Sequence, residues 1–473
     1  MTDRLDVLVL GGGISGLTAA FLLQKRGLSV RLLEAAERPG GCITTWRKDG
    51  FLFELGPNTV LNNAREIDRL CEEAGLLQDR LEAFPAARKR CVVKGGRLVA
   101  LPAGPLGFLA TPLFSLRAKV RLLKEPFIPP APPGREESIA TFVRRRLGPE
   151  LLDYAVAPFV SGVYAGDPEA LSVRHAVAKI HALEQEHGSL IRGALARRKG
   201  PAPQGGLFSF RDGLETLPRR LALALGEGYT APAAVLSVRR EGEAFSVVFC
   251  RPGGEGERME ARAVVSALPA AAASAVLAPL GGEFPQRVRD LPYADVALVC
   301  LGFRRQEVAH PLDGFGFLAP EVERRFVLGC LFPSSLFPGR APGGHVALSA
   351  FAGGAVHPER ASLGEEELVR ETLRDLAPLL GLRGSPVLSR VARWRPAIPQ
   401  YNLGHGDFLR AARQLEEAHP GLFVSGNLLY GVSVGNCIQN AFTVAERVET
   451  FLRRGGEGAG QGWAISPRGP FPR

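Results

Sequence analysis

The sequence predicts a mixed α/β fold that begins with a Rossmann-like domain. An apolar run at residues 5–10 has the pattern of a strand buried on both faces, as in a parallel sheet. The glycine-rich run 11–16 follows it, and a helical pattern over 15–26 leads to a second apolar run at 28–33. Strand, glycine turn, helix and strand in this order form one βαβ unit. With 473 residues, the chain has room for two or three domains.

Strand and helix patterns alternate along the rest of the chain. Residues 89–101 are predicted to form a hairpin that turns at Gly95–Gly96, and 136–200 are mainly helical in pattern. The tail 456–473, rich in Gly and Pro, is predicted to be disordered. Further helices are expected at residues 65–75, 364–380 and 435–453, and further strands at 231–250, 258–268, within 293–350 and at 422–426.

Composition indicates a globular protein with a basic charge balance. Apolar residues make up 46% and charged residues 22% of the chain, and the net charge is +10. That charge fits an acidic small molecule, an anionic membrane surface or nucleic acid as a partner. No nucleic-acid-binding module is recognisable, so we do not expect nucleic acid. Neither a signal peptide nor an uncharged stretch of 18 residues is found, so no transmembrane helix is expected.

The cysteines are dispersed along the chain. None forms C-x-x-C, and none stands beside His at metal-ligand spacing, so the sequence predicts no metal site. An odd, scattered set indicates reduced thiols of a cytosolic protein, most of them small core residues. The seven are Cys42, Cys71, Cys91, Cys250, Cys300, Cys330 and Cys437.

The first glycine run has the spacing of a dinucleotide-binding loop, Gly11-x-Gly13-x-x-Gly16. Gly11 permits a tight turn, Gly13 lets the backbone approach a pyrophosphate, and Gly16 lets helix and strand pack closely. The N-terminus of the following helix offers free N–H groups and a positive dipole end to phosphate. Glu34 closes the second strand, where a carboxylate can accept both hydroxyl groups of a ribose.

Two further glycine-rich segments extend this pattern. Arg38 can pair with a phosphate, and Gly40–Gly41 admit a close backbone approach. Near the other end of the chain, a strand that ends at Gly426 precedes a helix that starts near Gly435. The N-terminus of that helix would stabilise negative charge on a reduced cofactor. A plain loop and an ordinary strand–turn–helix unit are the alternatives for the two segments.

Together these elements resemble the flavin amine oxidase superfamily, where Arg38–Gly41 matches an R-x-G-G extension. Further segments resemble the protoporphyrinogen oxidase family in particular, in the same order over nearly the whole chain. The most specific are P-Q-Y-x-x-G-H and S-G-V-Y-A-G-D. The family often has Asp where this chain has Asn436, and we draw no functional conclusion from that difference. The segments are Phe53–Asn58, Ser161–Asp167, Asp313–Leu318, Ile398–His405 and Gly431–Ile438.

The resemblance implies three parts. A Rossmann-like FAD-binding domain of the GR2 type would be assembled from residues 1–87, 205–275 and 412–455. A helical domain at 88–204 would contact the membrane, and a mixed-sheet domain at 276–411 would bind the substrate. Within the helical part, an apolar stretch starting at residue 104 precedes four cations, which fits peripheral membrane contact, with a buried helix as the alternative. The cations are Arg117, Lys119, Arg121 and Lys124.

The resemblance also implies binding residues for non-covalent FAD and for the substrate. Arg90 matches the arginine that binds a substrate propionate, with a surface salt bridge as the alternative. Gly162, Ala165, Phe315, Phe317 and Leu318 complete the expected substrate site, although core packing is the alternative for the last three. No residue is assigned a catalytic role, and His405 is expected to be structural. The expected FAD contacts are Gly11, Gly13, Ile14, Ser15, Gly16, Glu34, Ala35, Arg38, Gly41, Gly56, Pro57, Asn58, Thr59, Val235, Trp394, Gly426, Val432, Ser433 and Val434.

The implied activity is the oxidation of protoporphyrinogen IX to protoporphyrin IX in haem biosynthesis. Six electrons would leave in three flavin cycles, and dioxygen would reoxidise the flavin and yield hydrogen peroxide. The implied location is cytoplasmic, with peripheral attachment to the inner face of the cell membrane. A homodimer, and hand-over of product to the next haem-pathway enzyme, are further options.

Three alternatives stay open. Coproporphyrinogen III differs from protoporphyrinogen only by two propionates in place of two vinyl groups. An amine oxidase or carotenoid desaturase is more distant: Cys437 lies near the point where some amine oxidases attach flavin covalently, but no cage of two Tyr is evident. A non-catalytic protein of this fold, like the Rab GDP-dissociation inhibitors that lack flavin, is the alternative from another class, against which the intact glycines, Glu34 and Arg38–Gly41 argue.

Overall fold

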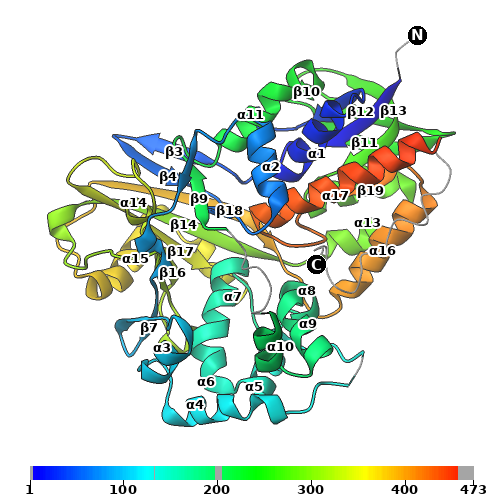
Figure 1. The fold of residues 1–473 in the computed structure, drawn as a ribbon. Coiled ribbons are helices and arrows are strands. Elements are labelled where there is room, and N and C mark those ends of the chain that lie inside the picture. The colour runs from blue at the N-terminus through cyan, green and yellow to red at the C-terminus, as the bar shows by residue number, and fades with distance from the viewer. Residues whose placement is uncertain (1–3, 133, 198–204, 456–473) are drawn as a thin grey trace.

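Residues 5–33 form the predicted βαβ unit. Strand β1 (Leu5–Leu10), helix α1 (Ile14–Lys25) and strand β2 (Val30–Leu33) follow one another, and β1 pairs with β2 in parallel. The structure is a computed structural model that describes residues 4–132, 134–197 and 205–455. Figure 1 shows α1 beside helix α17 (Val434–Arg453), near the other end of the chain. The tail at 456–473, expected to be disordered, lies outside the described residues.

The first sheet takes its strands from distant parts of the chain. Its order is β10-β2-β1-β13-β12-β11, and β19 pairs with β13. The pairs that join β10, β2, β1, β13 and β19 are parallel, whereas β12 and β11 are antiparallel additions. The carboxyl ends of the parallel strands therefore meet at one edge, where ligands bind in open α/β sheets. The later strands are β10 (Tyr229–Thr230), β11 (Ala234–Glu241), β12 (Ala244–Cys250), β13 (Gly256–Ser266) and β19 (Leu422–Val424).

Apolar clusters cover both faces of this sheet. Val7 and Val9 of β1 pack with α1, α17, α2 and α11, whereas Leu8 and Leu10 pack with α12, α13 and α16. Alternate residues of β1 thus face opposite layers, as expected for a strand buried on both sides. The helices not yet given are α2 (Arg65–Glu73), α11 (Thr216–Leu225), α12 (Ala270–Leu277), α13 (Phe284–Arg289) and α16 (His405–Ala418).

The second sheet has the order β18-β14-β17-β16-β15-β7-β8. The hairpin predicted at residues 89–101 is confirmed as β7 and β8, and β7 joins the sheet by pairing in parallel with β15. Helix α15 (Glu365–Leu380) packs against one face through a large apolar cluster. The strands are β7 (Arg90–Lys94), β8 (Arg97–Ala100), β14 (Tyr293–Arg304), β15 (Gly316–Leu318), β16 (Val327–Leu331), β17 (His345–Gly353) and β18 (Leu388–Pro399).

The described residues between 104 and 197 are mainly helical, as predicted for those from 136 onward. A buried ion cluster stabilises it: the Arg146 Nε lies 3.3 Å from a Glu125 oxygen and 2.8 Å from a Glu184 oxygen. A buried guanidinium has lost its hydration, so its charge must be paired with carboxylates such as these. A π-helical turn at Leu152–Val156 joins α6 to α7. The helices are α3 (Gly104–Ala110), α4 (Leu116–Leu123), α5 (Ile139–Arg146), α6 (Pro149–Leu151), α7 (Ala157–Tyr164), α8 (Val173–Ala176), α9 (Ala178–His187) and α10 (Leu190–Arg197).

Two small sheets tie the remaining segments together. Strands β3 (Thr45–Lys48) and β4 (Phe51–Glu54) form a hairpin. Strand β9 (Leu207–Phe210) lies between β5 (Val60–Leu61) and β6 (Arg80–Glu82), and so joins chain segments from before and after the helical stretch.

The structure adds elements that the sequence patterns did not predict. They include strand β18, the helices α11, α12, α13 and α16, and the strands of the two small sheets. All seven cysteines lie in the described part of the chain, and none is in a disulfide. No helix among the described residues is long and apolar enough to cross a membrane.

Candidate functional site

The turn between β1 and α1 is an open cradle of glycines. A Cβ at Gly16 would lie 2.0 Å from the carbonyl oxygen of Gly11, so helix and strand pack too closely for a side chain there. At Gly13, by contrast, a Cβ would meet no protein atom within 4 Å. Helix α1 starts directly after Gly13, with Ile14 and Ser15 in its first turn, and no side chain caps it. Its free N–H groups and its dipole therefore face the space beside Gly13.

Glu34 is fixed beside this cradle by two backbone donors. Its Oε2 accepts the N–H of Gly12 at 2.5 Å, and its Oε1 accepts that of Ala36 at 2.7 Å. The carbonyl of Glu34 accepts the N–H of Ala233 at 2.6 Å, which brings Val235 of β11 to the same end of the sheet. Ala35, next to Glu34, is exposed there. A carboxylate at the end of β2 has the position that ribose recognition requires.

Arg38 shapes the loop that lies against the cradle. Its guanidinium donates to the carbonyl of Gly41 at 2.7 Å and to that of Ile43 at 3.1 Å. Gly40 forms an isolated parallel bridge with Gly13, which sets this loop beside the glycine turn. A phosphate contact of Arg38 stays a prediction, and the contacts present are with the loop's own carbonyls.

The segment Gly56–Thr59 lies against the same loop. A Cβ at Gly56 would stand 1.9 Å from the carbonyl oxygen of Cys42, so only glycine fits there. The indole N–H of Trp394 donates to the carbonyl of Leu55 at 2.6 Å. Strand β18 therefore positions the start of this segment, which also contains Pro57 and Asn58, through Trp394.

The parallel strand β19 brings the third glycine segment to the same edge of the sheet. The Ser425 N–H donates to the carbonyl of Ser266, at the end of β13. At Gly426, with φ +104°, a Cβ would meet no protein atom within 4 Å. Helix α17 starts at Val434, and the Ser433 hydroxyl accepts the N–H of Asn436 at 3.1 Å. A second helix N-terminus thus faces the site, with Val432 just before it.

These features fit an anionic dinucleotide cofactor. Two glycine positions, Gly13 and Gly426, open onto space rather than onto protein. Two helix N-termini supply N–H donors and positive dipole ends, and Glu34 supplies an acceptor. Among the described residues, no cluster of His, Cys, Asp or Glu could hold a metal ion.

Most of the residues expected at the substrate site meet where α7 packs on the second sheet. A Cβ at Gly162 would lie 2.7 Å from Cδ2 of Leu318, and the carbonyl of Ala165 accepts the N–H of Ala355 at 2.7 Å. Arg90 is exposed, and its guanidinium lies 5.1 Å from the centre of the Phe315 ring. The nearby carboxylate of Asp313 pairs with Lys89 at 2.8 Å, and substrate binding by Arg90 stays a prediction.

Phe317 lies on the other face of that sheet. Its side chain is 2% exposed and belongs to the apolar cluster under α15, where its ring is 6.4 Å from that of Phe332. Because successive residues of a strand point to opposite faces, Phe317 cannot share a cavity with Leu318. The structure therefore favours the core-packing alternative for Phe317.

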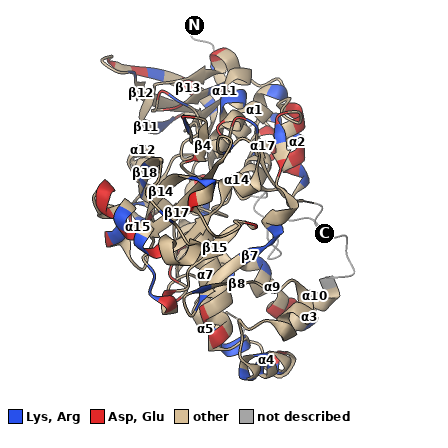
Figure 2. Ribbon diagram, turned by 90° about the vertical axis from the view of Figure 1, so that its left-hand side faces the viewer, with Lys and Arg blue, Asp and Glu red and all other residues tan. Residues whose placement is uncertain are grey.

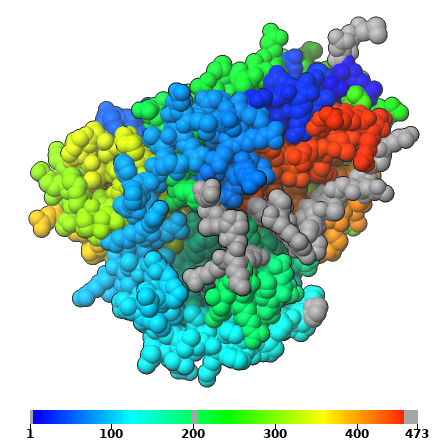
Figure 3. All heavy atoms as spheres, in the orientation of Figure 1, coloured from blue at the N-terminus to red at the C-terminus, as the bar shows by residue number. Residues whose placement is uncertain are grey.

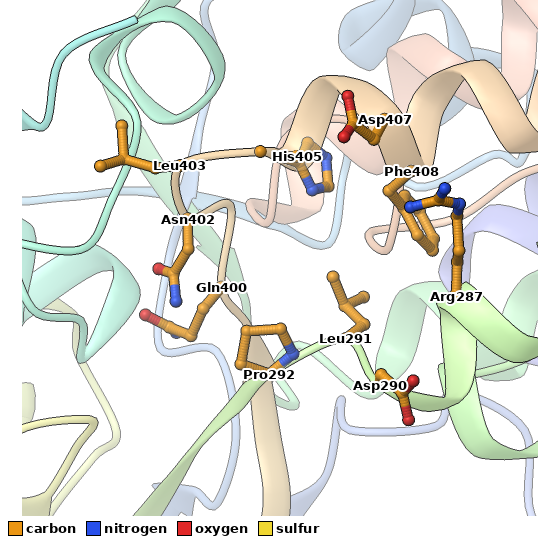
Figure 4. Close-up of a pocket in the computed structure, with 11 residues that line it drawn as sticks. Arg287, Asp290, Leu291, Pro292, Gln400, Asn402, Leu403, His405, Asp407 and Phe408 are labelled. Atoms are coloured by element: carbon orange, nitrogen blue, oxygen red, sulfur yellow. The ribbon is translucent and has the colours of Figure 1, made fainter.

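Three neighbouring side chains in the 400–405 segment make contacts that the sequence did not predict. Gln400, Tyr401 and His405 are all buried. Figure 4 shows Gln400 and His405 at a cavity of about 420 Å³ between this segment and α13. Burial lowers the pKa of His405 to about 4, so the imidazole is neutral at neutral pH. The structural role expected for His405 agrees with these contacts.

Comparisons with known proteins agree with this geometry. The model of the family "Flavin containing amine oxidoreductase" matches residues 14–449. The chain is 34% identical over 479 residues to the chloroplastic protoporphyrinogen oxidase of Oryza sativa subsp. japonica, covering 95% of this chain and 89% of that protein. It is 28% identical to the coproporphyrinogen III oxidase of Bacillus subtilis (strain 168), covering 96% of this chain and all of that protein.

The fold is similar to known structures over the same length. A crystal structure of a candidate protoporphyrinogen oxidase from Exiguobacterium sp. 255-15 superposes with a TM-score of 0.79 at 26% identity, and covers 95% of this chain and 99% of that one. The chain belongs to the flavin-containing amine oxidoreductase family. Within that family it is a protoporphyrinogen oxidase-like member, in the group of porphyrinogen oxidases.

Proposed function

We propose that this chain oxidises protoporphyrinogen IX to protoporphyrin IX in haem biosynthesis, with non-covalent FAD as cofactor and dioxygen as the final acceptor. The observation that carries the proposal is the open glycine cradle, in a chain that resembles the rice protoporphyrinogen oxidase over 479 residues. Each turnover removes six electrons, and the three dioxygen molecules consumed leave as hydrogen peroxide.

In this proposal the first sheet holds the cofactor. The N–H groups at the start of α1 bind the pyrophosphate beside Gly13, and Glu34 accepts the ribose hydroxyls. Residues 432–434, at the start of α17, lie against the flavin, where the helix dipole favours negative charge. Bound FAD supplies the hydride acceptor, and the protein supplies position and electric field.

The substrate lies beside the contact between α7 and the second sheet. Gly162 and Leu318 give an apolar wall for the macrocycle, and Arg90 is a cation placed to bind a propionate. The carboxylates of the substrate then stay at the exposed edge, where Arg90 lies. No side chain is needed as a dedicated acid or base, because the flavin carries the redox chemistry.

Coproporphyrinogen III is the second candidate substrate. The observation that favours it is the similarity to the B. subtilis coproporphyrinogen III oxidase over that protein's whole length. Two propionates replace two vinyl groups in this substrate, so it carries two more negative charges.

The test is an aerobic assay of the FAD-loaded protein with each porphyrinogen in turn. We expect porphyrin fluorescence and peroxide to rise well above the rate of autoxidation, with protoporphyrinogen as the faster substrate. A faster reaction with coproporphyrinogen would replace the substrate assignment. A yellow protein that oxidises neither would move the function to amine or carotenoid oxidation. A colourless protein that cannot be loaded with FAD would favour the non-catalytic alternative.

We further propose that α3 and α4 attach the protein peripherally to an anionic membrane. Large apolar side chains there are left in solvent: Leu106 is 83% exposed, Leu116 76% and Leu123 69%. Figure 3 places this part of the chain at one end of the molecular surface, and Figure 2 shows positive positions around α4. Apolar side chains beside cations are typical of interfacial helices.

A further inference from the structure

The 400–405 segment is hydrogen-bonded to the loop of residues 427–433, which leads into α17. The Tyr401 hydroxyl donates to the carbonyl of Asn427, and Nε2 of His405 lies 3.1 Å from the carbonyl of Leu429. Because a carbonyl only accepts, Nε2 must carry the proton of this neutral imidazole. The rings of Tyr401 and His405 stack with centroids 4.5 Å apart. Two adjacent buried donors thus fix two carbonyls of one short loop.

The same segment is bonded to the chain that follows α7. The side-chain amide of Gln400 donates to the carbonyl of Tyr164 at 2.9 Å. The Ser172 N–H donates to the carbonyl of Tyr401, and the Leu403 N–H to that of Ala170, both at 2.9 Å. The 400–405 segment therefore bridges the helix expected at the substrate and the loop expected at the cofactor.

The loop is also held at other points, since Leu428 and Leu429 are buried in the apolar cluster on one face of the first sheet. The Asn440 side chain donates to the carbonyl of Tyr430 at 2.7 Å, and Gly431 takes a positive φ of +64° that allows the chain to turn sharply. Val432 then packs against the apolar cluster that contains Tyr401. The hydrogen bonds of Tyr401 and His405 therefore act together with this packing to set the path of residues 427–433 and the approach to the start of α17.

We propose that Tyr401 and His405 are positioning residues that fix residues 427–433 against the flavin and thereby set the FAD affinity and the reduction potential of the flavin. The inference rests on the proposed placement of the start of α17 at the cofactor. N–H donors and a dipole stabilise negative charge on the reduced cofactor only while they are aimed at it. Release of either carbonyl lets the loop move and weakens that stabilisation.

Three substitutions separate the hydrogen bonds from the packing. Tyr401→Phe removes only a hydroxyl, His405→Phe keeps a stacking ring but loses the donor, and His405→Gln keeps an N–H donor but loses the ring. Tyr154→Phe is the matched control, because the Tyr154 hydroxyl donates to Glu323 at 3.2 Å and its ring packs in an apolar cluster that contains no residue of the loop or of the 400–405 segment. For each variant we would measure the unfolding temperature, the FAD dissociation constant and the midpoint potential of the bound flavin.

We expect Tyr401→Phe and His405→Phe to weaken FAD binding about 2- to 10-fold, the range that one hydrogen bond supports, and to lower the midpoint potential. His405→Gln should restore both values toward those of the unmodified protein, and Tyr154→Phe should leave them unchanged. Unchanged affinity and potential in folded Tyr401→Phe would overturn the inference. The inference would also be overturned if His405→Phe kept the FAD affinity and midpoint potential of the unmodified protein while His405→Gln lost them. Packing of the ring alone would then explain the contacts.

This outcome is separable from failure of the proposed function. A protein that binds FAD but oxidises no porphyrinogen still gives the affinities and potentials above. If His405→Phe does not fold, Tyr401→Phe decides the question alone, because it removes a single oxygen atom. If the unmodified protein binds no FAD, both the proposed function and this inference fall.

Discussion

The three glycines of the first loop differ in the reason for which a glycine is present at each position. Gly11 needs a positive φ of +101°, and Gly16 must be small because the carbonyl of Gly11 is only 2.0 Å from where its Cβ would be. Gly13 has neither constraint: its φ is −72°, and a Cβ at this position would have no protein atom within 4 Å. Nothing in the protein alone requires glycine at this position, so a ligand is the remaining reason for it.

Gly13→Ala should therefore separate folding from cofactor binding. We expect the unfolding temperature of the FAD-free protein to change by no more than about 2 °C, as for an unstrained substitution into open space. FAD binding should weaken at least about tenfold, because the methyl group would occupy the path of the pyrophosphate. Calorimetry without FAD and a fluorescence titration with FAD measure the two effects.

Gly16→Ala is the matched control in the same loop. Its methyl group would overlap the Gly11 carbonyl, so it should destabilise the FAD-free protein by about 1–3 kcal/mol, the usual cost of overpacking. Equal FAD affinity of Gly13→Ala and the unmodified protein would show that the pyrophosphate does not pass Gly13.

At the scale of elements, the sequence predicted those whose signals are local. The βαβ unit, the β7–β8 hairpin, α15 and α17 each have an unbroken pattern with a turn or helix boundary beside it. Strand β18 was missed because it is an edge strand: Arg390, Arg393 and Arg395 point to solvent and interrupt any apolar run. Helix α16 was missed although its signal was present, with apolar residues at helical spacing at Phe408, Ala411, Ala412 and Leu415.

Helices α3 and α4 carry the prediction on membrane binding. The double variant Leu116→Glu/Leu123→Glu should reduce binding to anionic phospholipid vesicles by about tenfold or more, because two apolar anchors are lost and two repelling charges are added. Vesicle flotation measures the bound fraction. Leu223→Glu on α11 is the control, since Leu223 is 74% exposed on another helix. Equal loss in the control, or no loss in the double variant, would contradict a role of α3 and α4.

At the scale of the whole molecule, the site exists only because distant segments meet. The Gly13–Gly40 bridge, the Trp394 bond to Leu55 and the parallel pairing of β19 with β13 bring residues from the start, the late middle and the end of the chain to one edge. Motif chemistry predicted which residues belong there. It could not predict contacts such as Trp394 with Leu55, which depend on tertiary packing, nor which face of the second sheet Phe317 occupies, because both faces carry apolar residues.

The most direct test of the central claim is to mix the FAD-loaded protein with protoporphyrinogen in the absence of air. The proposal predicts that the visible absorbance band of oxidised flavin disappears on mixing, because the flavin takes up the first two of the substrate's six electrons. Admission of air should then restore the band, release peroxide and allow porphyrin fluorescence to appear. A flavin band that stays unchanged beside intact protoporphyrinogen would contradict the claim, because the bound cofactor would then not be the acceptor of the substrate's electrons.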